Sequence, residues 1–393
     1  MAISTHRRGG RQRNLAKLAR TVLMGGSLRM NQTIVTYAPG RAELLGNHTD
    51  YNEGYVLALA VDRGTTLTGR RRDDRMIKLH SRELGKSESV SLDHLAAEKV
   101  ADWSRYTLGV VDQFRRNEIP VEGFEAEITS NLPLGAGLSS SAALENATVL
   151  FLLQAFGGKL DPLQIAKFSQ MAEHDFVGVR CGLLDQISSL MSRAAHATFI
   201  DCRTYRVDHT PLSEHVDVII ANSGVKHALV EGEYNTRRTD CEAAARALGV
   251  KALRDVSAAD LAREKDRLAD RIYRRALHIV GENERVLQGM EALRHGDVAA
   301  FGKLMFASHE SSRVNFENSC PELDDLVAAA RETPGVHGAR LSGGGFGGAT
   351  INLVERGREE DVVRALTAAL PQVKCLVTVA ADGALSDARN RLA

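Results

Sequence analysis

The sequence predicts an α/β (α+β) protein with two domains that share a cleft, and three observations lead to this expectation. The chain has 393 residues, which exceeds one typical domain and suffices for two. From residue 34 onward, segments rich in β-branched and aromatic residues alternate with segments of helical periodicity. Two glycine-rich loops, at residues 135–141 and 341–351, interrupt this alternation and would let a ligand approach the backbone.

In the first half, the predicted elements follow from short runs of alternating or helical spacing. The predicted strands are residues 33–40, 54–61, further alternating segments within 63–81, and 123–130. The predicted helices are residues 101–117, 140–156 and 162–178. The second of these is a long apolar helix that ends at a Gly-Gly pair, so we expect it to be buried.

In the second half, strands return, helices follow, and the chain ends in a strand-rich segment. Residues 196–203 and 216–223 are predicted strands, and the chain up to residue 333 is predicted to be mostly helical. The end of the chain is predicted as strand 338–342, a glycine loop, strand 348–355, helix 359–370 and strand 375–380.

Domain limits follow from composition. Residues 1–30 are basic and short of acidic residues, and their apolar run "TVLM" is too short for a secretory signal. We expect a basic N-terminal arm here, with a transit peptide as the alternative and Met30 as a possible true start. The rest divides into an N-terminal domain over 31–210 and a C-terminal domain over 211–393, without a low-complexity linker between them.

Charge and cysteine content exclude several classes of function. Lys+Arg and Asp+Glu both number 50, so the net charge is zero, which argues against partners such as nucleic acid or an anionic membrane. No apolar run is long enough for a membrane span. The five cysteines are scattered without a CxxC pair, which favours reduced thiols in a cytoplasmic protein over a zinc site.

The segment "NLPLGAGLSSSAALENA" predicts a phosphate-binding loop. Gly135 and Gly137 permit close backbone approach, and the serines 139–141 lead into the long helix, whose first-turn N–H groups attract anions. The serine hydroxyls could also bind a magnesium ion. The segment is not a Walker loop, because no Gly-Lys-Ser/Thr follows the glycines. A simple serine N-cap after a glycine turn remains the alternative.

Two further segments leave alternatives open. The loop "LSGGGFGGATI" is either a flexible hairpin or a loop packed against another backbone, and Phe346 favours packing. Asp185 lies among leucines and an isoleucine, and a buried carboxylate requires a partner. That partner is either a structural arginine such as Arg180 or part of a functional site in which Asp185 adjoins a reacting hydroxyl.

Taken together, the motifs resemble the galactokinase branch of the GHMP small-molecule kinases. "PGRAELLGNHTDYNEGYVLALA", "LPLGAGLSSSAALE", "AEHDFVGVRCGLLDQ" and "LSGGGFGGATINLV" are similar to family motifs and occur in the family's order. The resemblance implies a two-domain GHMP kinase fold with the active site between the domains. It also implies phosphoryl transfer from ATP to the anomeric hydroxyl of a sugar, with galactose as the first candidate.

The resemblance also implies roles for individual residues. Asp185 would lie beside the reacting hydroxyl, and Arg41 would pair with it and offset phosphoryl charge. Ser141 and Glu173 would bind Mg²⁺, and Trp103 would lie near the adenine. The sugar would contact Arg41, Asn47, His48, Asp50, Gly182, Asp185 and Tyr234. The nucleotide phosphates would contact Gly135, Ala136, Gly137, Leu138, Ser139, Ser140 and Ser141. We expect a monomer or a weak homodimer.

One departure from the family pattern concerns the substrate. Asn47 stands where the family carries Glu, and Glu43 stands where it carries Asn. In a strand these positions would lie roughly 13 Å apart, whereas in a helix they would be neighbours. The sequence therefore allows a tolerated substitution in a galactose kinase, or a substrate that differs at C5 or C6, such as a galacturonate-like or 6-deoxy sugar. An inactive sugar and ATP sensor is disfavoured, because Arg41, Glu173 and Asp185 are all present.

Overall fold

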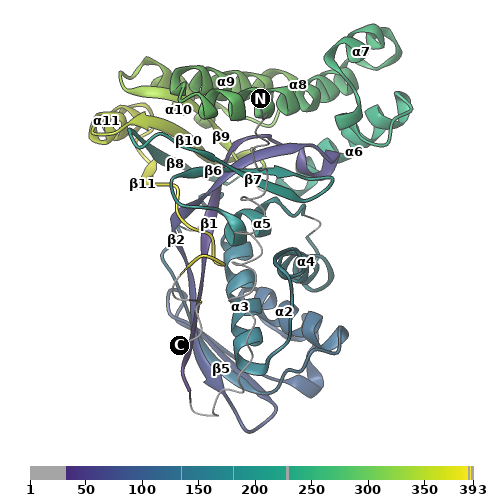
Figure 1. The fold of residues 1–393 in the computed structure, drawn as a ribbon, viewed down its shortest axis with the longest axis vertical. Coiled ribbons are helices and arrows are strands. Elements are labelled where there is room, and N and C mark those ends of the chain that lie inside the picture. The colour runs from purple at the N-terminus through teal and green to yellow at the C-terminus, as the bar shows by residue number, and fades with distance from the viewer. Residues whose placement is uncertain (1–31, 134, 180, 227–229, 388–389, 391–393) are drawn as a thin grey trace, which may run out of the picture.

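The computed structural model describes residues 32–387 and 390, apart from 134, 180 and 227–229 (Figure 1). The predicted arm at 1–30, the candidate start at Met30 and the candidate partner Arg180 lie outside these residues. In the described part of the chain, no helix is both long and apolar enough to cross a membrane.

A seven-stranded sheet forms one half of the molecule. Its strands are β1 (Ile34–Leu45), β2 (Tyr55–Arg71), β3 (Met76–Ser81), β4 (Lys86–Ser91), β5 (Phe124–Ser130), β6 (His196–Asp201) and β7 (Arg206–Pro211). They run in the order β4-β3-β5-β2-β6-β7, with β1 paired to β2. The 17-residue β2 is the centre of the sheet because one part of it pairs with β5 and another with β6.

Four helices lie beside this sheet: α2 (Arg105–Arg116), α3 (Ser140–Phe156), α4 (Pro162–Ala172) and α5 (Leu184–Met191). The α3 helix packs on β1 and β2 and is surrounded by the other three (Figure 1). This position explains its nearly all-apolar sequence, because a helix that is covered on all sides has no face that needs polar residues.

A second sheet has the order β11-β8-β10-β9 and is antiparallel throughout. Its strands are β8 (Val216–Lys226), β9 (Val336–Ser342), β10 (Gly347–Glu355) and β11 (Lys374–Thr378). The helices of this half are α6 (Val230–Ala247), α7 (Ala258–Arg263), α8 (Asp270–Arg294), α9 (Val298–Ser311), α10 (Pro321–Glu332) and α11 (Glu359–Ala369). The change from one sheet to the other falls between Pro211 and Val216.

A shared apolar core holds the two halves together. Leu57 and Leu59 of β2 belong to the same buried cluster as Ile220 of β8, Ile351 of β10 and Phe301 of α9. Burying a side chain of this size contributes roughly 1.5–3 kcal/mol. The chain end adds a link, because the Ala381 N–H donates to the Ala60 carbonyl at 2.9 Å. The walls of a cleft between the halves are therefore fixed by packing.

The mixed α/β class is confirmed, while two predicted elements need correction and one strand was not predicted. The helix predicted over 162–178 ends as an α-helix at Ala172, and Glu173–Val177 form a wider π-helical turn. The first strand was predicted to end at residue 40 but runs to Leu45, because bulges let it continue past Gly40. Strand β7 was not predicted, because its polar, Pro-terminated sequence has little strand character.

Candidate active site

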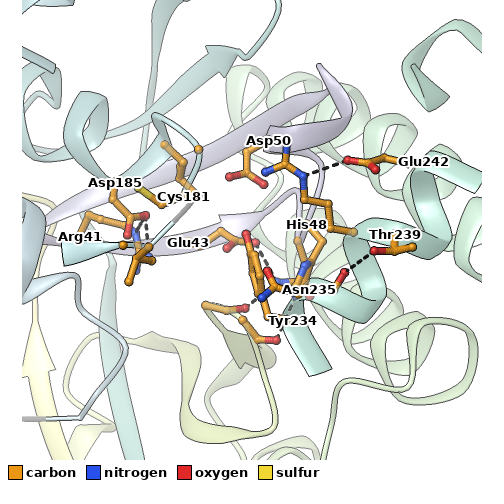
Figure 2. Close-up of a pocket in the computed structure, with 18 residues that line it drawn as sticks. Arg41, Glu43, His48, Asp50, Cys181, Asp185, Tyr234, Asn235, Thr239 and Glu242 are labelled. Atoms are coloured by element: carbon orange, nitrogen blue, oxygen red, sulfur yellow. Dashed lines mark hydrogen bonds and ion pairs between the residues drawn. The ribbon is translucent and has the colours of Figure 1, made fainter. Parts of the chain in front are cut away.

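A pocket of about 680 Å³ opens between the two halves, a volume typical of small-molecule sites (Figure 2). Its walls come from β1 and the turn that follows it, the segment before α5, helix α6 and the β9–β10 loop. All seven residues predicted to contact the sugar line this pocket: Arg41, Asn47, His48, Asp50, Gly182, Asp185 and Tyr234.

Arg41 and Asp185 form a charged pair at one end of the pocket. Arg41 Nε donates to Asp185 Oδ1 at 2.7 Å, and Arg41 Nη1 donates to the Gly137 carbonyl at 2.6 Å. A register shift in β1 between Pro39 and Arg41 marks a bulge, which re-aims the arginine side chain. The described partner of Asp185 is thus an arginine 144 residues away, and this arginine also holds the glycine loop.

The loop before α3 combines glycine flexibility with an open helix start. Gly135 and Gly137 have positive φ angles of 72° and 66°, and Ser139 has a φ of 52°. The serine-cap alternative is wrong for Ser139, because its side chain caps no helix N–H. Its hydroxyl instead donates to Asp185 Oδ2. The first-turn N–H groups of α3 therefore remain for an anionic ligand.

Two buried carboxylates lie behind this loop. The Ser141 hydroxyl hydrogen-bonds to Glu173, and burial raises the pKa of that carboxyl. Glu145 on α3 is also buried, burial raises its pKa well above the usual range, and its Oε1 has no partner. Glu145 was not among the residues predicted from the sequence, although an acid inside an apolar helix indicates a buried carboxylate.

These groups fit a divalent cation. An unpartnered carboxylate oxygen, a second carboxylate and a hydroxyl are oxygen ligands of the kind that Mg²⁺ prefers. In the part of the chain that the structure describes, no cluster of three or more His, Cys, Asp and Glu is arranged for a metal. A Mg²⁺ ion held by one or two protein oxygens together with nucleotide phosphates needs no such cluster.

The opposite wall carries aromatic and acidic groups suited to sugar hydroxyls. The His48 ring nitrogens contact the Tyr51 hydroxyl at 2.8 Å and the Gly344 carbonyl at 3.0 Å. Burial lowers the pKa of His48 to about 4, so the ring is neutral at pH 7. Burial raises the pKa of Asp50 to about 6. A Cβ at Gly182 would lie 2.1 Å from Asp50 Oδ2, so only glycine leaves room for this carboxylate.

Asn47 and Trp103 differ from the rest of the predicted set. Asn47 lines the pocket but is only 1% exposed, and its amide donates to the Gly343 carbonyl at 2.7 Å. Trp103 lies in the short helix Asp102–Ser104, half-buried against the core of the first half, and does not line this pocket. A contact between Trp103 and adenine stays a prediction.

Sequence reasoning did not assign eleven of the lining residues to the sugar site, and five of these carry charged, amide or hydroxyl side chains: Glu43, Asn235, Arg238, Thr239 and Glu242. Four of them lie on α6, as does Tyr234, and their spacing contains a signal that was available. Positions 234, 238 and 242 recur every four residues, which places their side chains on one helix face. Glu43 was noted in the sequence only as a departure from the family pattern.

The second glycine loop is packed rather than loose. A Cβ at Gly345 would lie 2.1 Å from the Asn318 carbonyl, and the Phe346 N–H donates to that carbonyl at 2.7 Å. The Arg237 guanidinium lies 5.2 Å from the centre of the Phe346 ring. The packing interpretation is confirmed, and the flexible-hairpin alternative is wrong.

Three segments of the sequence match models of known protein families. Residues 105–193 match the N-terminal domain of GHMP kinases, and residues 290–372 match the GHMP kinase C-terminal domain. Residues 28–71 match the galactokinase galactose-binding signature. That signature contains the turn after β1, from which His48 and Asp50 reach the pocket.

Individual relatives agree over most of the chain. The chain is 44% identical to human galactokinase over 81% of its own length and 83% of the relative's. It is 42% identical to galactokinase of Chloroflexus aggregans, over 86% and 87% of the two chains. A solved structure of Lactococcus lactis galactokinase complexed with galactose superposes with a TM-score of 0.86 at 30% identity, covering 90% of this chain and 95% of that one.

Proposed function

This chain belongs to the galactokinase branch of the GHMP kinase family, and from that membership we propose that it phosphorylates galactose at the anomeric hydroxyl, using ATP. The observation that carries the proposal is the Arg41–Asp185 pair. It lies where the pocket meets the glycine loop, because Arg41 contacts both Asp185 and the Gly137 carbonyl.

The pair accounts for the transfer step. Asp185 accepts a hydrogen bond from the anomeric hydroxyl, orients its oxygen and takes its proton as the new O–P bond forms. The bond between the γ-phosphorus and the bridging oxygen breaks, and ADP leaves. Arg41 and the first-turn N–H groups of α3 offset charge on the phosphoryl group in transit. Positioning and charge compensation carry most of the catalysis in this type of reaction.

The same geometry supports the remaining roles proposed for residues of the site. The backbone of residues 135–141 holds the phosphates. Ser141 and Glu173 would hold Mg²⁺, which would neutralise charge on the nucleotide phosphates. The pocket wall of His48, Asp50 and Tyr234 binds sugar hydroxyls. We also propose a cytoplasmic monomer or weak homodimer.

The similarity to galactokinases over about four fifths of the chain favours galactose over a galacturonate-like or 6-deoxy sugar. A sensor without activity is disfavoured by the geometry, because Asp185 contacts both Arg41 and Ser139 and lines the open pocket.

Replacing Asp185 by Asn tests the proposal, because the amide keeps the shape but cannot accept the proton. We expect galactose-dependent ADP release to fall by about 10²- to 10⁴-fold, while ATP binding measured by calorimetry changes little. Unaltered enzyme must prefer galactose over other sugars in the same assay. Near-normal turnover by Asp185→Asn would show that this carboxylate does not serve the transfer.

A further inference from the structure

Glu43 is a pocket residue that the proposed mechanism does not yet use. It lies on β1, is 3% exposed, and lines the same pocket as His48 and Asp50. Figure 2 shows its carboxylate on the pocket wall between Asp185 and His48. A buried charge in such a place needs compensation, and a binding site is one place where incomplete compensation has a use.

The contacts of Glu43 engage only one of its two oxygens. Arg340 Nη1 donates to Glu43 Oε1 at 3.1 Å, and Asn47 Nδ2 lies 3.4 Å from the same oxygen. Arg340 is fully buried, so its guanidinium offsets the carboxylate charge from behind the pocket. No described residue donates to Oε2, and this oxygen is not sealed in the interior. Since Glu43 lines the pocket, Oε2 is free to accept a hydrogen bond from a ligand.

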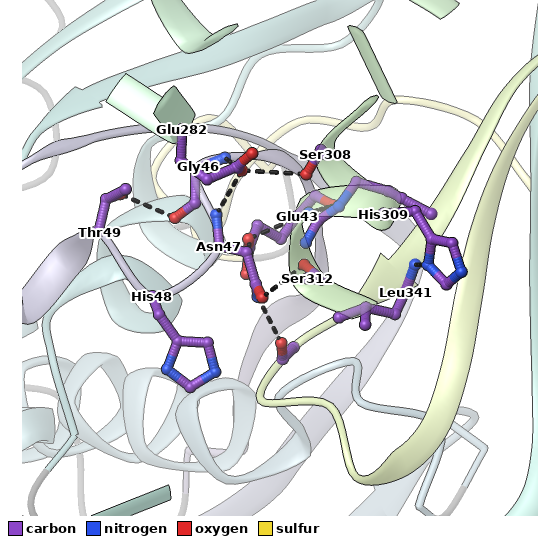
Figure 3. Close-up of polar contacts among 12 residues, drawn as sticks. Glu43, Gly46, Asn47, His48, Thr49, Glu282, Ser308, His309, Ser312 and Leu341 are labelled. Atoms are coloured by element: carbon purple, nitrogen blue, oxygen red, sulfur yellow. Dashed lines mark hydrogen bonds and ion pairs between the residues drawn. The ribbon is translucent and has the colours of Figure 1, made fainter. Parts of the chain in front are cut away.

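Asn47 shows the opposite arrangement (Figure 3). Its Nδ2 donates to the Gly343 carbonyl at 2.7 Å and approaches Glu43 Oε1. Its Oδ1 accepts from Asn318 Nδ2 at 2.9 Å and lies 3.4 Å from Ser312 Oγ. An amide side chain has two donor hydrogens and one acceptor oxygen, and all of these have protein partners here.

The backbone around Asn47 is held in the same way. Glu282 Oε2 accepts from the N–H groups of Gly46 and Asn47, each at 3.0 Å, and His278 Nε2 lies 3.1 Å from the Asn47 carbonyl. Both partners are on α8. The turn after β1 is therefore tied to the second half of the molecule through side chain and backbone alike.

Local backbone geometry brings residues 43 and 47 together. The register of β1 shifts between Glu43 and Leu45, and Gly46 and His48 have positive φ angles of 101° and 61°. This bulge and turn fold the chain back, so the roughly 13 Å separation of a straight strand does not apply. A helix is not needed for the contact either.

We infer that Glu43, rather than Asn47, is the specificity-determining carboxylate that accepts hydrogen bonds from hydroxyls of the neutral sugar, and that Asn47 is a positioning residue for the β9–β10 loop. The inference rests on the proposed function. Glu43 and Asp50 then face the substrate with two carboxylates. A sugar acid would meet repulsion from both, so this arrangement selects neutral sugars.

The test is a double-perturbation cycle, in which a change in the Glu43 side chain is combined with the removal of one sugar hydroxyl at a time. The variant Glu43→Gln and the unaltered enzyme are assayed with galactose and with its 2-, 3-, 4- and 6-deoxy forms. We expect kcat/KM for galactose to fall about ten- to a hundredfold in Glu43→Gln, with the KM for ATP within about twofold. For at least one deoxy sugar, the penalty for the missing hydroxyl should shrink by about fivefold or more in the variant.

Two further variants separate recognition from folding. Glu43→Gln combined with Arg340→Met removes both buried charges and should fold, because such pairs are often replaceable by neutral groups. Asp240→Asn is the matched control, since Asp240 pairs with the buried Arg275 at 3.6 Å and does not line the pocket. It should leave every deoxy-sugar penalty unchanged.

The outcomes distinguish the inference about Glu43 from the proposed function on which it rests. Deoxy-sugar penalties equal to those of unaltered enzyme in both Glu43 variants would overturn the inference while leaving the proposed function intact. Failure of the unaltered enzyme to phosphorylate galactose would refute the proposed function itself. A selective change in one hydroxyl's penalty supports the inference, because a purely structural role would weaken all the sugars alike.

Discussion

Replacing Asp50 by Asn should make the sugar-free protein more stable at neutral pH, although it damages the pocket. Burial, with further contributions from the charges of Glu43 and Asp185, raises the pKa of Asp50 from 3.8 to about 6. A hydrogen bond from the Tyr51 backbone N–H and the charge of Arg238 act in the opposite direction but do not offset burial. No described side chain donates a hydrogen bond to this carboxylate. The charge therefore costs folding free energy in the absence of a ligand that can offset it.

The size of the effect follows from linkage between ionisation and folding. A pKa difference of about 2 pH units corresponds to about 3 kcal/mol, because one unit is worth about 1.4 kcal/mol. For a chain of this length, unfolding entropy is of order 0.8 kcal/mol per degree, so the melting temperature should rise by about 4 °C.

The sign of the pH dependence is fixed by the direction of the pKa change. A raised folded-state pKa means that the Asp50 contribution is favourable below about pH 4 and is lost as the pH rises through about 6. Since Asn is neutral at every pH, Asp50→Asn should show its full gain at pH 8, about half of it near pH 5 and almost none near pH 3. Thermal unfolding followed by calorimetry at these pH values measures this.

Asp201 provides a control, because its replacement by Asn should change the stability of the protein in the opposite direction. Its carboxylate accepts hydrogen bonds from Arg254 and from backbone N–H groups, and its pKa is lowered to about 2 despite burial. Asp201→Asn should therefore destabilise the protein by about 2 kcal/mol at pH 7, with the loss shrinking as the pH falls from 4 towards 2. A lower melting temperature for Asp50→Asn at pH 8, or a gain that is the same at every pH, would refute the reasoning for Asp50.

Two further substitutions probe how the site is held. Gly182→Ala should push the Asp50 carboxylate aside, because the new Cβ would lie 2.1 Å from Oδ2. The KM for galactose should rise by about tenfold while the KM for ATP stays constant, and an unchanged galactose KM would contradict the steric role. Ser139→Ala removes the hydroxyl that donates to Asp185. We expect kcat to fall by about three- to tenfold with little change in melting temperature, and a kcat equal to that of unaltered enzyme would show that Ser139 does not orient Asp185.

Several local features could be predicted because their causes are local. Helix α3 was predicted over 140–156 and forms Ser140–Phe156, since its apolar run and terminal Gly-Gly pair specify both its type and its end. The segment with Arg41, His48 and Asp50 was identified because its short motif resembles one of the galactokinase branch. The π-helical turn at Glu173–Val177 was not foreseen, because no residue there breaks the helical pattern before Gly178.

The partners of these residues could not be predicted from local spacing in the sequence. Nearness in the chain suggested Arg180, which lies outside the described residues, as a partner for Asp185. Only the family resemblance implied Arg41, because the ion pair between Arg41 and Asp185 spans 144 residues. The roles of Glu43 and Asn47 were weighed with an ideal strand and an ideal helix, and the chain uses neither. A bulge and two positive φ angles set their separation, and these depend on how β1 meets β2 and α8.

By itself, the sequence determined the α/β class, the family and the residue types that gather at the pocket, because periodicity and motif order are properties of short segments. Only the tertiary structure decided which oxygen of which acid faces the pocket. The side-chain amide of Asn47 is hydrogen-bonded to protein partners such as the Gly343 carbonyl, 296 residues away, while Glu43 Oε2 has no described donor. The physical reason is that the hydrogen bonds of a polar side chain depend on every group near it in space. The apolar core shared by the two sheets determines which groups those are.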